Sequence, residues 1–248
     1  MNFKKYILLL LLLVIPFLFT SCFDVDNYDA PNAGIYGTLI DTELNTPVYT
    51  EQPDGCRIEL LDLSYENPTP LRFWAKADGT FRNVALFGGE YKVTPTEGPF
   101  FPVETETVKL NGVTQHDFKV VPYLQLEIVD ILKGSEGSAE VSVKYKVKRS
   151  TPPAGITLEQ KTIAEVWILC NTAPVVSYSN SGYKENISYK KEFSRTSDTN
   201  IEKTVYEDKI PNLVTGQKYY MRLSGRSTTA SNTLKRMNYT QTVEFTAP

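Results

Sequence analysis

The amino-acid sequence predicts an all-β protein, with two β-sandwich domains in tandem after a lipoprotein signal peptide. Short runs of alternating apolar and polar residues, bounded by Gly, Pro, Asn and Asp, recur along the chain, whereas helical periodicity is nearly absent. The 227 residues from position 22 onward exceed one typical domain and fit two. The charge also divides: residues 22–121 carry 16 acidic and 7 basic side chains, and residues 122–248 carry 13 and 17. These observations place a domain boundary near residue 121.

The first 21 residues have the layout of a secretory signal peptide. Lys4 and Lys5 precede an apolar run of about 13 residues, which is too short to span a bilayer that needs about 20. Thr20-Ser21-Cys22 then resembles a bacterial lipobox, although Phe19 stands where a smaller aliphatic residue is more typical. We therefore expect cleavage before Cys22 and acylation of its thiol, which anchors the chain to a membrane. The alternatives are an ordinary signal peptide with an incidental cysteine, or an uncleaved anchor.

Residues 22–33 are expected to form a lipidated tether. Asp24, Asp26 and Asp29 make the segment acidic, but it lacks the glycine and the terminal glutamate of a calcium-binding loop. The segment resembles the acidic export signal that directs lipoproteins of Bacteroidetes to the outer face of the outer membrane. This resemblance implies an outer-membrane, lipid-anchored protein that faces the cell surface.

Residues 34–121 are expected to form the first sandwich from about seven short strands. The expected strands and turns are Gly34–Asp41, Cys56–Leu61, Leu71–Lys76, the Asp78-Gly79 turn into Thr80–Arg82, Leu86–Val93, Val103–Leu110 and Thr114–Val121. Gly37 to Asp41 with Pro47-Val48, the Asp78–Phe81 turn and Gly89–Val93 resemble the carboxypeptidase-regulatory-like, or transthyretin-like, sandwich. Such domains usually act as non-catalytic scaffolds or spacers.

Residues 122–248 are expected to form the second sandwich. Val141, Val143, Tyr145 and Val147 alternate strictly with polar residues, which is typical of a strand with one buried face. The spacing of Leu213, Gly216 and Tyr219 resembles the tyrosine corner of a fibronectin type III domain. Its expected strands are Leu124–Ile128, Val141–Lys148, Ala164–Cys170, Tyr219–Leu223 and Tyr239–Phe245. A long polar stretch, residues 173–206, is expected to be a loop with its own hairpin.

Taken whole, the chain resembles a family of two-domain Bacteroidetes surface lipoproteins that is catalogued as a domain of unknown function. The stretches that carry the resemblance are Asp26–Pro31, Asp78–Asn83, Gly98–Phe100 and Val121–Tyr123. Members are similar to accessory components of polysaccharide-uptake systems, and the expected partners are a membrane, polysaccharide, a TonB-dependent transporter and a glycan-binding lipoprotein. The resemblance implies a non-enzymatic protein that assists glycan capture or uptake. The alternatives are a structural or adhesive protein that binds other proteins and, less favoured, a glycan-modifying enzyme.

The residues offer little catalytic or metal-binding chemistry. Cys56 and Cys170 fall in different domains beside apolar residues, which favours two buried structural thiols over a disulfide or a metal pair. The single histidine, His116, alternates with Phe118 and is expected to pack against the core. No spacing marks a carboxylate pair for glycoside hydrolysis, and no basic run is dense enough for nucleic acid. We expect no catalytic site, metal or cofactor.

Trp74 is the first candidate binding residue. It shares a strand face with Arg72 and Lys76, so its ring would be exposed to the apolar face of a sugar while the cations bond hydroxyls. The alternative, that Trp74 packs against the second domain, is favoured because tryptophan is highly buried on average. Trp167 lies beside Val166 in a predicted strand and is expected to be core.

Two further aromatic groups are candidates for binding. Phe100 and Phe101, flanked by prolines, form one spot, with the same alternatives of ligand contact or packing. Tyr178, Tyr183 and Tyr189 belong to the long polar stretch, where recognition residues are often found. Their alternative is a loop that packs on itself.

Overall fold

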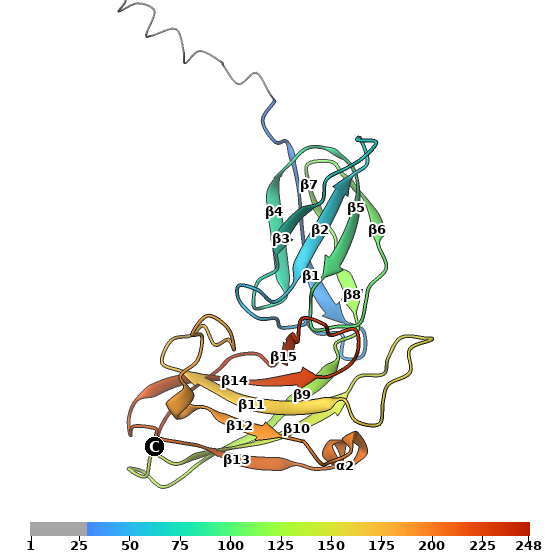
Figure 1. The fold of residues 1–248 in the computed structure, drawn as a ribbon. Helices are drawn as coiled ribbons and strands as arrows, with labels where there is room; N and C mark the ends of the chain where they lie inside the picture. The colour runs from blue at the N-terminus through green and yellow to red at the C-terminus, as the bar shows by residue number, and fades with distance from the viewer. Residues whose placement is uncertain (1–28) are drawn as a thin grey trace, which may run out of the picture. The chain divides into compact units, whose positions relative to one another are not determined.

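The computed structural model describes residues 29–248. The predicted signal peptide, Cys22 and most of the predicted tether lie outside the described residues. Residues Asn32–Pro248 form one compact unit that contains two β-sandwiches, as the sequence predicts for the fold class (Figure 1). Within residues 29–248, no helix combines the length and the apolar character needed to span a bilayer.

The first sandwich contains two sheets and the first eight strands. One sheet has the order β4 (Thr80–Leu86), β1 (Ala33–Asp41), β7 (Val113–Gln115), and β8 (Phe118–Val120) also pairs with β1. The other has the order β3 (Leu71–Trp74), β2 (Arg57–Asp62), β5 (Gly89–Thr96), β6 (Glu106–Leu110). The inner faces bury one apolar core, whose largest members include Phe81, Phe118, Ile35, Leu39 and Ile58.

One expected strand of the first sandwich is divided. The sequence predicts a single strand over Thr114–Val121, but β7 and β8 are separate and both run parallel to β1. The Asp117 carboxylate accepts a bond from the Thr38 N–H at 2.8 Å, so a side chain replaces the backbone ladder at this point. The neighbouring His116 is half-buried: its ring packs edge-to-face on the core residue Phe118, with ring centroids 4.7 Å apart, and its Nε2 lies 3.0 Å from the Glu106 carboxylate.

The predicted Asp78-Gly79 turn is confirmed. Gly79 has a φ of +79°, and a Cβ there would lie 2.5 Å from the carbonyl oxygen of Val48. Only glycine fits both the backbone angle and this close approach. The Asp78 carboxylate accepts the Thr80 N–H at 3.0 Å and thereby closes the turn.

The second sandwich packs a three-stranded sheet against a five-stranded sheet. The smaller sheet has the order β13 (Tyr206–Ile210), β10 (Val141–Arg149), β9 (Leu124–Lys133). The larger has the order β12 (Tyr189–Glu192), β11 (Ile163–Asn171), β14 (Lys218–Ser227), β15 (Met237–Tyr239), and β16 (Val243–Thr246) pairs with β14. The alternation predicted in β10 is confirmed, because Val141, Val143, Tyr145 and Val147 are all fully buried. Cys170 lies in this core and Cys56 in the first, both as free buried thiols.

The tyrosine corner is also present. The Val214 N–H donates to the Tyr219 hydroxyl at 3.0 Å, so the phenol closes the turn before β14. The long polar stretch is not a simple hairpin loop: it contains a 3₁₀ turn η3 (Glu185–Ile187), the edge strand β12 and the short helix α2 (Asp198–Glu202). Its first part, residues 172–183, lies over the outer face of the larger sheet, where a third apolar cluster forms.

Candidate functional site

Trp167 lies on the outer face of the larger sheet. In β11, Val166, Ile168 and Cys170 enter the main core of the second sandwich, whereas Trp167 is half-buried and belongs to the separate outer cluster. The expectation that Trp167 lies in the core is therefore wrong, because Trp167 packs outside the main core of the second sandwich. The reason is the two-residue period of a strand, which sends Trp167 to the face opposite its two apolar neighbours.

Residues 172–183 bring two of the predicted tyrosines to this tryptophan. The ring centroids of Tyr178 and Tyr183 lie 5.4 and 5.7 Å from that of Trp167, both in edge-to-face geometry. The two tyrosine rings stack on each other at 5.8 Å with an interplanar angle of 7°. Tyr178 is 40% exposed, and the other two rings are half-buried. We call Trp167, Tyr178 and Tyr183 the aromatic platform.

A row of charges borders the aromatic platform. Glu165, on the same face of β11, pairs with Lys190 at 3.0 Å and with Arg226 at 2.9 Å. The Lys190 ammonium also lies 5.3 Å from the centre of the Trp167 ring, within cation–π range. Burial alone would raise the pKa of Glu165, but the bonds and charges of Arg226 and Lys190 outweigh it and hold that pKa below its ordinary value.

The same charged residues line a hollow of about 340 Å³ on the larger sheet. Glu165, Lys190 and Arg226 form part of its wall, together with Lys161, Ile163, Ala164, Glu192, Phe193, Ser194 and Thr228. The three rings of the aromatic platform do not line this hollow, but Lys190, which lies over the Trp167 ring, belongs to its wall. Flat rings beside a few fixed polar groups are the usual composition of a small-molecule site.

This arrangement suits a neutral polyhydroxyl ligand. A sugar ring has an apolar face that packs on an aromatic ring, and its edge carries hydroxyls that bond to carboxylate, ammonium and guanidinium groups. Residues 29–248 hold no cluster of three or more His, Cys, Asp and Glu side chains able to bind a metal ion. The polar groups that border the aromatic platform are the Glu165 carboxylate, the Lys190 ammonium and the Arg226 guanidinium, which can accept or donate hydrogen bonds.

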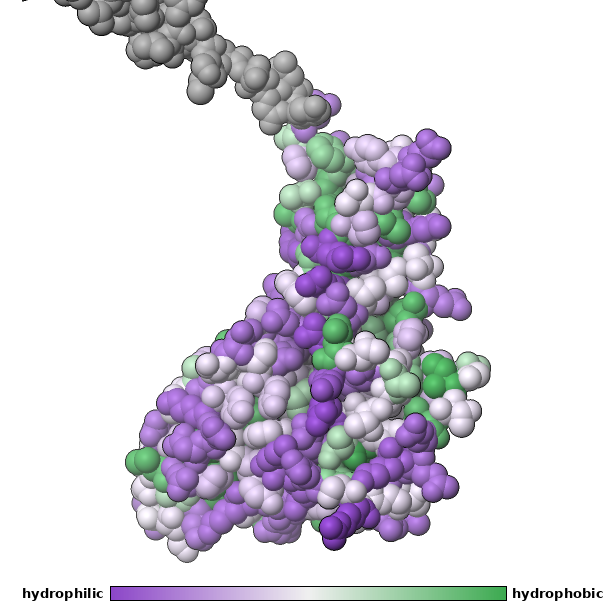
Figure 2. Space-filling view, in the orientation of Figure 1, coloured by the Kyte–Doolittle hydropathy of each residue, from purple (hydrophilic) through white to green (hydrophobic). Residues whose placement is uncertain are grey.

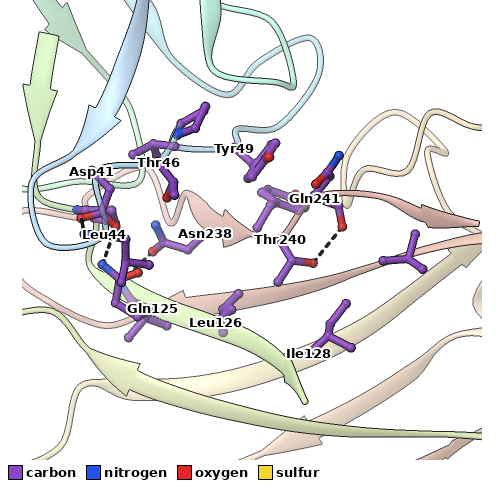
Figure 3. Close-up of a pocket in the computed structure, with 16 residues that line it drawn as sticks. Asp41, Leu44, Thr46, Tyr49, Gln125, Leu126, Ile128, Asn238, Thr240 and Gln241 are labelled. Carbon is purple, nitrogen blue, oxygen red and sulfur yellow. Dashed lines mark hydrogen bonds between the residues drawn. The ribbon is translucent and has the colours of Figure 1, made fainter. Parts of the chain in front are cut away.

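A second hollow, of about 290 Å³, lies between the two sandwiches (Figure 3). Leu126 and Ile128 project from β9 on one side, and Tyr49 comes from the first sandwich. Its buried polar groups already have partners: the Gln125 amide donates to Asp41, and the Asn238 amide donates to the Pro99 carbonyl at 2.8 Å. These groups hold the sandwiches together, so we treat this hollow as an interface.

Trp74 packs at the junction of the sandwiches, as the favoured alternative predicts. The Arg57 guanidinium lies 4.3 Å from its ring centre, and that of Arg236, from the second sandwich, lies 5.7 Å away. Glu97 pairs with both arginines, at 3.3 and 3.5 Å. The other two candidates on this strand face are exposed: Arg72 pairs with Glu59 at 2.6 Å, and Lys76 borders the Asp78-Gly79 turn.

The remaining aromatic candidates are not on the aromatic platform. Phe100 is 4% exposed in the first core and Phe101 is 1% exposed in the second, so packing is the correct alternative for both. Tyr189 points to the core side of β12, where it packs against the second core beside Lys191. The structure therefore brings together two of the eight predicted binding residues, Tyr178 and Tyr183, and adds Trp167. On the face shown in Figure 2, polar and apolar residues are intermixed.

Comparison with known proteins supports the fold. Residues 33–121 match the model of the N-terminal domain of DUF3823, a family of proteins of unknown function. A comparison with curated proteins finds no match. A DUF3823 family protein from Bacteroides uniformis is similar over 88% of this chain and 100% of its own, with a TM-score of 0.74 and 21% identity.

Two other crystal structures are similar. One is a proposed carbohydrate-binding protein from Bacteroides uniformis, with a TM-score of 0.69 and 19% identity over 87% of this chain and 99% of its own. The other is a DUF3823 family protein from Parabacteroides merdae, with a TM-score of 0.63 and 20% identity over 88% of this chain and 100% of its own. None of these three is described as an enzyme. At such identities the likeness establishes a shared fold over the two sandwiches, and residues 33–121 are similar to the DUF3823 N-terminal domain.

Proposed function

We propose that this chain is a DUF3823 family member that serves as a non-enzymatic, lipid-anchored protein of the outer-membrane surface and binds glycan for an uptake system. The observation that carries the proposal is the aromatic platform, with an exposed Tyr178 stacked on Tyr183 beside the charged row of Glu165, Lys190 and Arg226. The fold it shares with a proposed carbohydrate-binding protein supports the same conclusion. The partners we propose are a polysaccharide, a TonB-dependent transporter and its glycan-binding lipoprotein.

Affinity electrophoresis through gels that contain individual polysaccharides tests this function. We expect the protein to be retarded by at least one polysaccharide. Tyr178→Ala removes the exposed ring of the aromatic platform and is expected to weaken the affinity roughly tenfold, which corresponds to about 1.4 kcal/mol of binding free energy. Tyr65→Ala is the matched control, because Tyr65 is a 67% exposed tyrosine on the first sandwich. Equal weakening by both variants would contradict the aromatic platform as the binding site.

Lipidation at Cys22 is the part of the proposal that sets the location. In cells, Cys22→Ala is expected to abolish acylation and to move the protein from the membrane fraction to the soluble fraction, since multiple acyl chains supply stable anchoring. A Cys22→Ala protein that remains in the membrane fraction would show that another feature anchors it.

The alternative function is binding to another protein. An apolar hollow of about 340 Å³ on the first sandwich, bordered by the exposed residues Tyr65, Leu71 and Phe87, favours that function. No retardation by any polysaccharide, with the protein folded, would favour this alternative over glycan binding.

A further inference from the structure

The first sandwich contributes a buried acid to the segment that carries the aromatic platform. Glu51, in the loop between β1 and β2, is only 6% exposed. Its Oε1 accepts bonds from the Tyr239 hydroxyl at 3.0 Å, the Ser177 hydroxyl at 3.3 Å and the Ser179 N–H at 2.6 Å. All three donors belong to the second sandwich, so this carboxylate crosses the junction between the two.

These bonds converge on one residue of the aromatic platform. Ser177 and Ser179 are the immediate neighbours of Tyr178, and the Tyr178 N–H itself donates to the Tyr239 hydroxyl at 3.2 Å. The backbone on both sides of Tyr178 is therefore held by Glu51, directly or through Tyr239. Fixed backbone on both sides limits where the Tyr178 ring can lie.

A buried arginine reinforces the same arrangement. The Arg222 guanidinium donates to the Thr50 carbonyl of the first sandwich at 3.3 Å. It also donates, at 3.1 Å, to the carbonyl of Val176, which lies in the segment 172–183 that carries Tyr178. It lies 4.3 Å from the centre of the Tyr239 ring, and burial lowers its pKa to about 10. Arg222 thus joins the residue before Glu51 to the residue before Ser177.

A buried carboxylate is costly unless hydrogen bonds or a cation compensate it. Among residues 29–248, Glu51 has no direct salt bridge, so its charge is compensated by the hydroxyl and N–H donors of the second sandwich, together with the charge of the nearby buried Arg222. The dependence is mutual, because removing the carboxylate leaves the Ser179 N–H and the Tyr239 hydroxyl without their acceptor.

We infer that Glu51 is a positioning residue of the aromatic platform, so the proposed binding site is a composite of both sandwiches. The first sandwich places Tyr178 against Trp167 through Glu51, and the site is pre-organised only when the sandwiches are docked. What the site binds rests on the proposed function, whereas the positioning can be measured without any ligand.

The experiment follows Trp167 in the full chain. The protein has two tryptophans, so Trp74→Phe leaves Trp167 as the only indole. In this background we expect Glu51→Leu to change the emission maximum and the acrylamide quenching of Trp167, because Tyr178 leaves the indole. We also expect faster chymotryptic cleavage after Tyr178 in both the native-Trp74 and the Trp74→Phe chains.

Two variants separate positioning from general damage. Glu51→Gln keeps a carbonyl acceptor. It is expected to show the same Trp167 emission, and the same slow cleavage after Tyr178, as the chain that keeps Glu51. Glu43→Leu removes another acid that bridges the sandwiches, through Lys148 and the Thr151 N–H, and is expected to leave both readouts unchanged. If Glu51→Leu does not yield folded protein, Tyr239→Phe removes the shared hydroxyl and is expected to move both readouts in the same direction.

A Trp167 emission and a cleavage rate that stay unchanged in Glu51→Leu would overturn the inference, as would equal changes in Glu43→Leu. When a polysaccharide ligand is known, Glu51→Leu is expected to weaken retardation roughly tenfold through lost pre-organisation, and Glu51→Gln is expected to retain it. If the wild-type protein binds no polysaccharide, the proposed function fails, while the fluorescence and cleavage results still decide the role of Glu51.

Discussion

Glu165 is the residue that organises the charges beside the aromatic platform. Its side chain is buried, and its lowered pKa means that the folded state holds it ionised between Lys190 and Arg226. A carboxyl whose pKa is lower in the folded than in the unfolded state adds stability above the unfolded value, here about 4.5, and loses it as the pH falls through the folded value. The contribution of Glu165 is therefore fully present at neutral pH.

We expect Glu165→Gln to destabilise the protein by about 1–3 kcal/mol at pH 7, since the amide leaves two cations without their carboxylate. The difference from wild type is expected to shrink as the pH falls below the ordinary value of about 4.5 and through the lowered pKa of the folded state, where the wild-type carboxyl takes up its proton. Urea unfolding at a series of pH values measures this. Glu192→Gln, which removes an exposed partner of Lys190, is the control and is expected to have a small effect at every pH. A pH-independent difference for Glu165→Gln would show that packing, and not ionisation, makes Glu165 important.

At the scale of the element, strands were predictable where the pattern is local. The alternation of Val141 to Val147 predicts a half-buried strand because period two is a property of the strand alone, and β10 has this structure. Trp167 shows the same rule applied incorrectly: its partners on one face are Glu165 and Leu169, two residues away, and not Val166. The acidic character of Glu165 already indicated that this face points outward from the main core.

The loop over that face could not be predicted in the same way. Residues 172–183 are held down by the outer cluster of Leu169, Val176, Met237 and Tyr239, which joins three separate parts of the chain. Such contacts depend on which strands become neighbours, and no local period encodes them. The burial of Glu51 is a further case, because a charged residue in a turn-rich loop is expected to be solvated until a second sandwich supplies its donors.

At the scale of the whole molecule, the two sandwiches are joined by shared packing. Phe100 lies in the first core and Phe101 in the second, so adjacent residues anchor both sandwiches to one short segment. The Phe101 ring packs edge-to-face on Tyr123 at 5.0 Å, and the Asn238 amide donates to the Pro99 carbonyl directly before this pair. Trp74 and Arg236 add a cation–π contact across the junction.

This continuity predicts that the two sandwiches unfold in one cooperative transition. Trp74 reports on the first sandwich and Trp167 on the second, so Trp167→Phe and Trp74→Phe each leave one reporter. In each variant, we expect the urea curves followed by fluorescence and by circular dichroism to coincide. Phe245→Ala is then added to the variant that keeps Trp74, where it opens a cavity in the second core alone. It is expected to lower the free energy of unfolding by about 3–5 kcal/mol, and to lower the urea midpoint that Trp74 fluorescence reports for the first sandwich. A Trp74 midpoint that Phe245→Ala leaves unchanged would mean that the sandwiches unfold independently, and that their contact is too weak to hold the aromatic platform in place.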